Sequence, residues 1–145
     1  MPRLYTSTPA AFTPAAANTI WEIIAGANKP VYIKRVELSS ANTSGTIVVV
    51  AKMERITVTG TGTAQTPEPL DANDAAAAAT CKVNDTVEPT KGNQIWSVEW
   101  NIQVPYIWIA GPGEEWRANP AGGFGIELLT APGASIMVAV SFEED

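Results

Sequence analysis

The chain of 145 residues contains no histidine and a single cysteine, Cys81. Without histidine, neither a Ser-His-Asp nor a Cys-His nucleophile system can be assembled. A histidine-containing zinc site is excluded as well, and one cysteine is too few for a cysteine-rich site. Histidine is also the usual general base near neutral pH, so any catalysis would rest on carboxylates alone. We therefore predict a protein that is not an enzyme and that has no catalytic residues, no metal and no cofactor.

Charge is also scarce, and basic charge most of all. The chain has 9 basic and 15 acidic side chains, which give a formal net charge of -6 at pH 7. Nucleic-acid binding needs a basic stripe that displaces counterions from phosphates, and no such stripe is present, so no nucleic-acid partner is expected. Charged residues form 17% of the chain, against roughly 25% in ordinary soluble domains. A surface of small, weakly hydrated residues suits burial against a partner, and it equally suits a neutral, threonine-rich β surface.

Long hydrophobic runs are missing too. No uncharged apolar stretch approaches the roughly 20 residues that cross a bilayer, so no membrane partner is expected. The residues from Met1 to Tyr5 carry no hydrophobic signal core, which predicts a protein without a secretory signal. Cys81 is then expected to be an ordinary free thiol of the cytoplasm in which the chain is made.

What the sequence does contain is alternation of apolar and polar residues with a period of two, which is typical of half-buried strands. The clearest predicted strand covers residues 95–104, where Trp96, Val98 and Trp100 point to one side. In residues 31–39 the apolar phase changes, which predicts a β-bulge near Lys34 and Arg35. Further strands are predicted at residues 19–25, 47–58, 106–110, 124–129 and 136–143.

Eight or so short strands, separated by turns rich in glycine and proline, predict an all-β fold, an antiparallel β-sandwich. A jelly roll of about eight strands is the first choice, because that number fits two four-stranded sheets. An immunoglobulin-like sandwich is the alternative. We predict one domain over residues 19–145, with a long loop at about 59–93. Within this loop we expect one strand at Thr80–Val83 and a short helical turn over residues 75–79, with Asp74 as its N-cap.

The first eighteen residues include three prolines among small side chains, so neither a helix nor a central strand is expected there. We predict an extended N-terminal arm over residues 1–18 that lies on a partner. Its anchors would be Leu4, Tyr5 and Phe12. A free tail is the alternative interpretation.

The chain has five tryptophans, and most of them are expected in the core. Trp116 is the best candidate for exposure, because Glu115 and Arg117 flank it beside a turn. An exposed tryptophan anchors protein interfaces or stacks on sugars, so Trp116 is the fourth candidate for a partner contact. The acid–base candidates are loop carboxylates that we expect to be solvated, namely Glu68, Asp71, Asp74, Glu114 and Glu115.

Several segments of the chain carry a wider resemblance. They are the Pro/Ala/Thr-rich start, Thr19–Ile24, Lys29–Ile33, Val36–Leu38, Pro69–Asp71, Ala75–Thr80, Gly125–Leu128, Thr130–Pro132, Ile136–Val140 and Phe142–Glu144. In this order they resemble the small virion proteins of jelly-roll type from tailed bacteriophages, which include capsid decoration, or cement, proteins. No functional motif is transferred residue by residue.

The resemblance implies a structural virion protein that binds the major capsid protein on the outer surface of a phage capsid and stabilises the shell. It also implies a homo-oligomer, a homotrimer, that is made in the host cytoplasm and ends up in the virion. The alternative is a carbohydrate- or receptor-binding β-sandwich of a phage fibre or tail. That alternative predicts an exposed shelf of tryptophan or tyrosine.

Overall fold

The structure, a computed structural model, describes residues 2–145. Over these residues the chain forms twelve β-strands and no helix. The strands are β1 (Arg3–Ser7), β2 (Thr19–Ile24), β3 (Val31–Ser40), β4 (Val48–Val58), β5 (Thr61–Gln65), β6 (Glu68–Pro69), β7 (Thr80–Val87), β8 (Thr90–Asn101), β9 (Tyr106–Ile109), β10 (Trp116–Ala118), β11 (Gly123–Leu128) and β12 (Ile136–Glu144).

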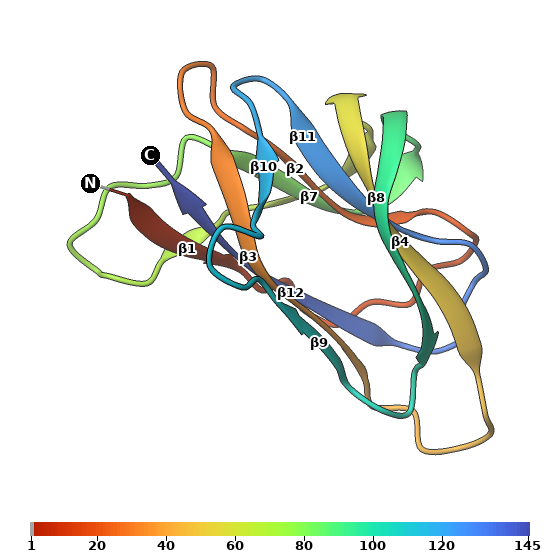
Figure 1. The fold of residues 1–145 in the computed structure, drawn as a ribbon. Coiled ribbons are helices and arrows are strands. Elements are labelled where there is room, and N and C mark those ends of the chain that lie inside the picture. The colour runs from red at the N-terminus through yellow and green to blue at the C-terminus, as the bar shows by residue number, and fades with distance from the viewer. Residues whose placement is uncertain (1) are drawn as a thin grey trace.

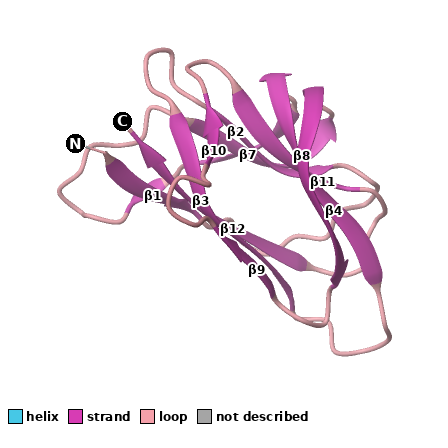
Figure 2. Cartoon of the chain, viewed as in Figure 1, coloured by secondary structure: helices cyan, strands magenta, loops and turns pink. Residues whose placement is uncertain are grey.

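These strands form two sheets that pack face to face with the hydrophobic core between them (Figures 1 and 2). Sheet A has the order β10-β3-β12-β1-β6, and β9 also pairs with β3. Sheet B has the order β5-β7-β2-β11-β4-β8. Every pairing is antiparallel. The predicted all-β antiparallel sandwich is therefore confirmed.

The strand order is that of a jelly roll, because the last two strands of the chain are inserted between early ones. β12 lies between β3 and β1 in sheet A, and β11 lies between β2 and β4 in sheet B. The rows β1-β12-β3-β9 and β2-β11-β4-β8 are then two four-stranded sheets, as the two Greek keys of a jelly roll require. β10 continues the β9 position beside β3, and β5, β6 and β7 are additional, which gives twelve strands instead of eight.

The additional strands replace the long loop that we predicted at 59–93. This segment contains β5, β6, β7 and the beginning of β8, and the strand predicted from Thr80 extends to Val87. The helical turn predicted over residues 75–79 is not formed, and these residues are irregular. The segment is polar and rich in threonine, so the alternation of apolar and polar residues that marks a strand is weak there. Threonine nevertheless suits strands, and β5 forms its backbone hydrogen bonds with β7.

The N-terminal segment lies on its own domain. β1 pairs with β12 from Arg3 opposite Glu144 to Ser7 opposite Val140, so both ends of the chain lie at one end of the sandwich (Figure 1). The prolines lie before and after β1, which is why they do not prevent this strand from forming. The described part of the predicted arm is thus a strand of sheet A followed by a connection to sheet B.

The predicted β-bulge is confirmed in β3. Arg35 lies opposite Ser141, whereas Ile33 lies opposite Phe142, so Lys34 is the extra residue. Both Ile33 and Val36 are consequently buried, although they are three positions apart. The change of phase visible in the sequence was the signature of this extra residue.

Candidate functional site

The outer face of sheet A exposes several large apolar side chains. Alternation along β9 exposes Ile107 and Ile109, which have 47% and 67% of their surfaces accessible, and along β12 it exposes Met137. The register places Ile107 opposite Glu37 and Ile109 opposite Arg35. Large apolar side chains therefore stand at the β9 edge of this face.

Several charges on this face are paired with one another. Arg35 Nη2 lies 2.6 Å from Glu37 Oε2. Lys34 Nζ lies 2.9 Å from Glu115 Oε1 and 3.1 Å from Glu143 Oε2. The hydrogen bond from Lys34 lowers the pKa of Glu115, and the same bond is the main cause that raises the pKa of Lys34. The face thus presents apolar groups and internally neutralised charge.

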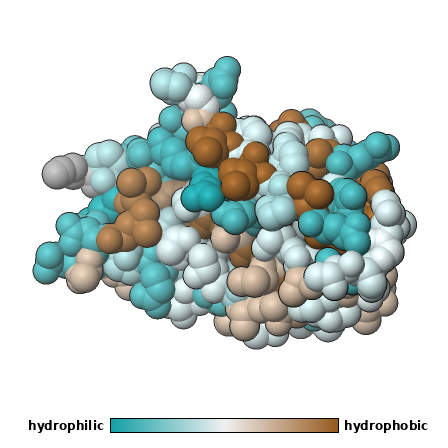
Figure 3. Space-filling model, turned by 90° about the horizontal axis from the view of Figure 1, so that it is seen from below, coloured by the Kyte–Doolittle hydropathy of each residue, from teal (hydrophilic) through white to brown (hydrophobic). Residues whose placement is uncertain are grey.

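Small side chains occupy the middle of the face, between β3 and β1. Opposite Arg35 on β12 lies Ser141, and opposite Ser141 on β1 lies Thr6. Figure 3 views the molecule from below and shows hydrophobic groups as separate islands among strongly hydrophilic and weakly polar ones. Covering the apolar islands with a partner would be favourable, since it removes apolar surface from water.

Strand β9 is also an exposed edge of the sheet. Among the described residues it pairs with β3 alone. Its sequence, from Tyr106 to Ile109, contains no charge and no proline, which are the usual means of protecting an edge from further pairing. The backbone of β9 is therefore open to a strand of a partner.

Behind β9, four aromatic side chains close the gap between the two sheets. The rings of Trp108 and Trp116 are stacked with centroids 3.7 Å apart. Trp96 of β8 lies 5.8 Å from the Trp116 ring and 5.6 Å from the Tyr106 ring. All four are half-buried and pack against the core. This aromatic cluster ties β9 and β10 of sheet A to β8 of sheet B, because each aromatic pair adds stabilisation beyond the area that it buries.

The structure separates the four candidates that the sequence singled out. Leu4 is exposed on β1 beside a hollow of about 570 Å³ that Arg3, Leu70 and Asp74 also line. Trp116 belongs to the aromatic cluster at the opposite edge of sheet A. Trp116 is half-buried and not exposed as predicted, because its ring packs against those of Trp96 and Trp108. Leu4 and Trp116 therefore do not form one site.

The other two candidates hold the N-terminal segment to its own domain. Tyr5 has no accessible surface, its ring lies 5.5 Å from that of Phe142, and its hydroxyl donates a hydrogen bond to the Ala75 carbonyl at 3.0 Å. Phe12 exchanges two backbone hydrogen bonds with Ile136, of 3.1 and 2.8 Å. Tyr5 is a core residue in this fold, and a partner cannot reach it.

The loop carboxylates do not converge. Glu115 is paired with Lys34, Asp74 Oδ1 lies 3.2 Å from Arg3 Nε, and Asp71 accepts the backbone N–H of Asn73. Glu114 and Glu68 are exposed. In residues 2–145, no three His, Cys, Asp or Glu side chains are grouped as metal ligands. The described part of the chain contains no helix that is long and apolar enough to cross a membrane.

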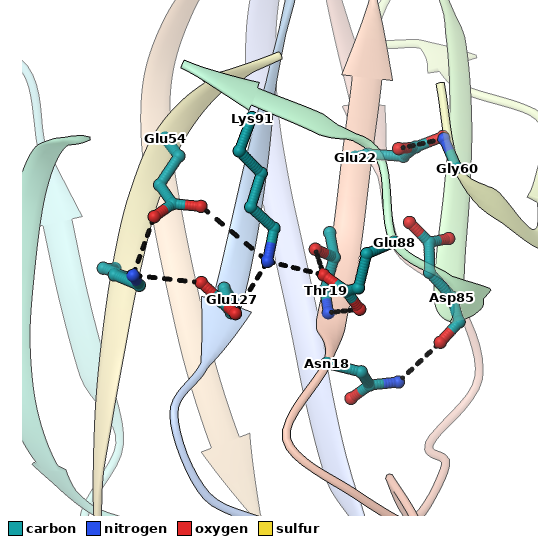
Figure 4. A network of polar contacts seen from close by, with 10 residues as sticks. Asn18, Thr19, Glu22, Glu54, Gly60, Asp85, Glu88, Lys91 and Glu127 are labelled. Carbon is teal, nitrogen blue, oxygen red and sulfur yellow. Dashed lines mark hydrogen bonds and ion pairs between the residues drawn. The ribbon is translucent and has the colours of Figure 1, made fainter. Parts of the chain in front are cut away.

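The outer face of sheet B carries a compact ionic network (Figure 4). Lys91 Nζ lies 2.6 Å from Glu88 Oε2 and 2.7 Å from Glu127 Oε1. Lys52 Nζ lies 2.8 Å from Glu54 Oε1 and 3.1 Å from Glu127 Oε2, and the bond to Glu54 is the main cause that raises the pKa of Lys52. Two lysines thus bind three glutamates, which leaves the network with one excess negative charge.

Two connections cross this face, because β4 and β8 lie on one side of β2 and β11, while β5 and β7 lie on the other. Glu88, in the β7–β8 connection, accepts hydrogen bonds from the backbone N–H and the hydroxyl of Thr19, at 2.8 and 2.6 Å. Gly60, in the β4–β5 connection, donates its N–H to Glu22 at 3.1 Å. Carboxylates thus fasten both connections to β2.

Sequence reasoning missed one unusual carboxyl group here, that of Asp85. It lies on β7, where Cys81, Val83 and Asp85 are buried in alternate positions. Burial is the main cause that raises the pKa of Asp85 to about 7, and the charge of Glu22 adds to it. Asn84 has a positive φ of 53°, which interrupts the regular alternation of β7 just before Asp85. No sequence pattern identified this residue.

Comparison with known proteins gives little further information. No protein-family model matches the chain, and no curated protein sequence matches it. Among solved structures, a chain from the infectious bursal disease virus Gx strain has 9% sequence identity and a TM-score of 0.22, over 99% of this chain and 41% of that one. A chain from the Gt strain has 15% identity and a TM-score of 0.21, over 99% of this chain and 40% of that one.

This chain therefore spans about two fifths of the length of the solved chains that it matches. Similarity at these TM-scores does not establish a shared fold. The architecture rests on the strand pairing described above.

Proposed function

We propose that the protein is a structural virion protein, a decoration or cement subunit that binds the outer surface of a bacteriophage capsid and stabilises the shell. It acts by contact and catalyses no reaction. The observation that carries the proposal is the outer face of sheet A, where exposed Ile107, Ile109 and Met137 stand among small side chains and paired charges. The resemblance of the sequence to jelly-roll virion proteins supports the same role.

The energetics of such a face suit a cement function. Fully burying one isoleucine contributes about 1.5–3 kcal/mol, so the two isoleucines of β9 offer a few kcal/mol per subunit. Binding that occurs only on the assembled shell stabilises the shell by mass action. We propose the major capsid protein as the partner and a homotrimer as the bound form. Three linked faces would bind far more tightly than one, through effective concentration.

Co-sedimentation with capsids tests this proposal. The wild-type protein is mixed with shells of the encoding virus assembled without it, and is expected to sediment with them. Joint replacement of Ile107 and Ile109 with aspartate is expected to abolish sedimentation, because charge would be buried at the contact. Val58→Asp, at an equally exposed valine of sheet B, serves as the matched control.

The circular dichroism of all three proteins should be that of the folded sandwich. Wild-type protein that stays in the supernatant, or an aspartate double variant that sediments as the wild type does, would overturn the proposal. The native mass measured in the same preparation checks the homotrimer.

A second function, glycan binding by a fibre or tail domain, is favoured by the half-buried aromatic cluster around Trp116. Stacking on the free face of a ring would bind a sugar. Titration of the intrinsic tryptophan fluorescence with a panel of glycans tests it. A fluorescence spectrum that changes with one glycan supports glycan binding, and a spectrum that is unchanged across the panel rules it out.

A further inference from the structure

Asp85 is the one carboxylate of the described chain whose two side-chain oxygens both lack a hydrogen-bond partner while buried. Only 3% of its surface is accessible. Buried carboxylates are almost always hydrogen-bonded or paired with a cation, since an isolated buried charge is strongly unfavourable. The environment of Asp85 therefore needs a physical explanation.

The carboxyl group is enclosed by two glycines at the start of β5. A Cβ atom on Gly60 would lie 2.7 Å from Asp85 Oδ2, and a Cβ atom on Gly62 would overlap Oδ1. Gly60 also donates its N–H to Glu22 Oε2 at 3.1 Å, and the Thr59 hydroxyl donates to Glu22 Oε1. Asp85 and Glu22 thus flank the same short segment, and Figure 4 shows both beside Gly60.

The charges around the pair do not balance two carboxylates. Lys82 of β7 is the nearest cation, but its Nζ lies 3.9 Å from Glu22 Oε1 and donates to the Thr59 hydroxyl and the Gly60 carbonyl, at 2.8 and 2.7 Å. Glu88, in the connection after β7, adds a further negative charge to the surroundings of Asp85. A proton is the smallest group that neutralises the excess charge.

We propose that Asp85 and Glu22 share one proton in the folded protein, with the Asp85 carboxyl group donating a hydrogen bond to the Glu22 carboxylate. The pair forms a latch that holds the β4–β5 connection and β5 against β2 and β7. When the proton is released to solvent, two carboxylates face each other across Gly60, and this part of sheet B loosens. The proposal is independent of the function proposed above.

Proton sharing gives this histidine-free chain a titrating group near neutral pH. Burial and the neighbouring Glu22 raise the pKa of Asp85 from 3.8 to about 7. Between these two pH values the folded protein binds a proton that the unfolded chain lacks. The equilibrium constant for folding therefore falls as the pH rises. For one proton the fall is roughly tenfold per pH unit, and it ends once the folded-state pKa is passed.

The test uses the full chain. Carbon-detected NMR follows the Asp85 carboxyl resonance of the wild-type protein from pH 3 to 9, which requires no variant. Hydrogen exchange of the β5 and β7 amides, compared with those of β12, is measured at pH 5 and at pH 8. We expect the resonance to titrate near neutral pH, and the β5 and β7 amides to exchange faster at pH 8 after correction for intrinsic exchange rates.

Two variants then separate the latch from general effects of charge. Asp85→Asn is expected to remove most of the pH dependence of unfolding between pH 5 and 8, whereas Glu99→Gln, at an exposed carboxylate of β8, is expected to leave it unchanged. An Asp85 resonance that titrates near pH 4 would overturn the proposal. So would an Asp85→Asn protein that keeps the pH slope of the wild type.

Discussion

Replacing Tyr5 with alanine removes the side chain that fastens β1 to the rest of the domain. The Tyr5 ring is fully buried and stacks on Phe142, and its hydroxyl donates a hydrogen bond to the Ala75 carbonyl in the β6–β7 connection. Two residues later, the Ser7 hydroxyl accepts a hydrogen bond from Trp21 Nε1 of sheet B at 3.0 Å. β1 is therefore attached to both sheets, and its loss would affect the whole sandwich.

The magnitude follows from burial. Truncating a fully buried aromatic ring to alanine destabilises a protein by about 3–5 kcal/mol, and losing one hydrogen bond to a partly buried carbonyl adds about 1 kcal/mol. For Tyr5→Ala we expect a loss of about 4–6 kcal/mol, a large part of the roughly 5–15 kcal/mol that stabilises a domain. Tyr5→Phe keeps the ring and loses only the hydroxyl, so about 1 kcal/mol is expected for this matched control.

Urea denaturation followed by tryptophan fluorescence measures both variants. A loss of unfolding free energy below about 1 kcal/mol for Tyr5→Ala would refute the reasoning, because truncating a buried ring destabilises a protein by more than this. It would mean that residues 3–7 are a dispensable tail, or an arm that becomes ordered only on a partner.

Three further outcomes are expected. Burial raises the pKa of the Cys81 thiol to about 12, so this thiol should not react with a thiol reagent at pH 8 until the protein unfolds. The absorbance of the reaction product, measured with and without urea, checks this. Lys91→Met should destabilise the domain by about 2 kcal/mol at pH 7, because Glu88 and Glu127 each lose a partner, at 2.6 and 2.7 Å, as urea titration would reveal. Gly62→Ala should lower the melting temperature much more than Gly92→Ala, because its Cβ would lie 2.8 Å from a backbone carbonyl, whereas the nearest atom at Gly92 lies 3.5 Å away.

The main strands could be predicted because their two faces differ in polarity. In β12, Ile136, Val138 and Val140 are buried and Met137 is exposed, as alternation predicts. The bulge at Lys34 was visible for the same reason, since one extra residue reverses the phase of everything after it. The jelly roll then followed from strand number, although the order of the strands came only from the pairing.

The remaining elements could not be predicted because their determinants are not local. β1 has five residues between prolines, and its place beside β12 depends on the opposite end of the chain. β5 is polar and exists through its ladder with β7. The apolar face of sheet A depends on β9 standing beside β3, and the buried Asp85 depends on two glycines elsewhere in the sequence. Pairing partners far apart in sequence leave no short-range pattern.

The central claim is that this protein works by contact through the outer face of sheet A, and the thermal disruption of capsids tests it most directly. Shells assembled without the protein are heated alone, with saturating wild-type protein, and with the protein in which Ile107 and Ile109 are both aspartate. We expect the wild type to raise the temperature at which the shells release their contents, and the double variant to leave it unchanged. A temperature that the wild type does not raise, or that both proteins raise equally, would contradict the claim.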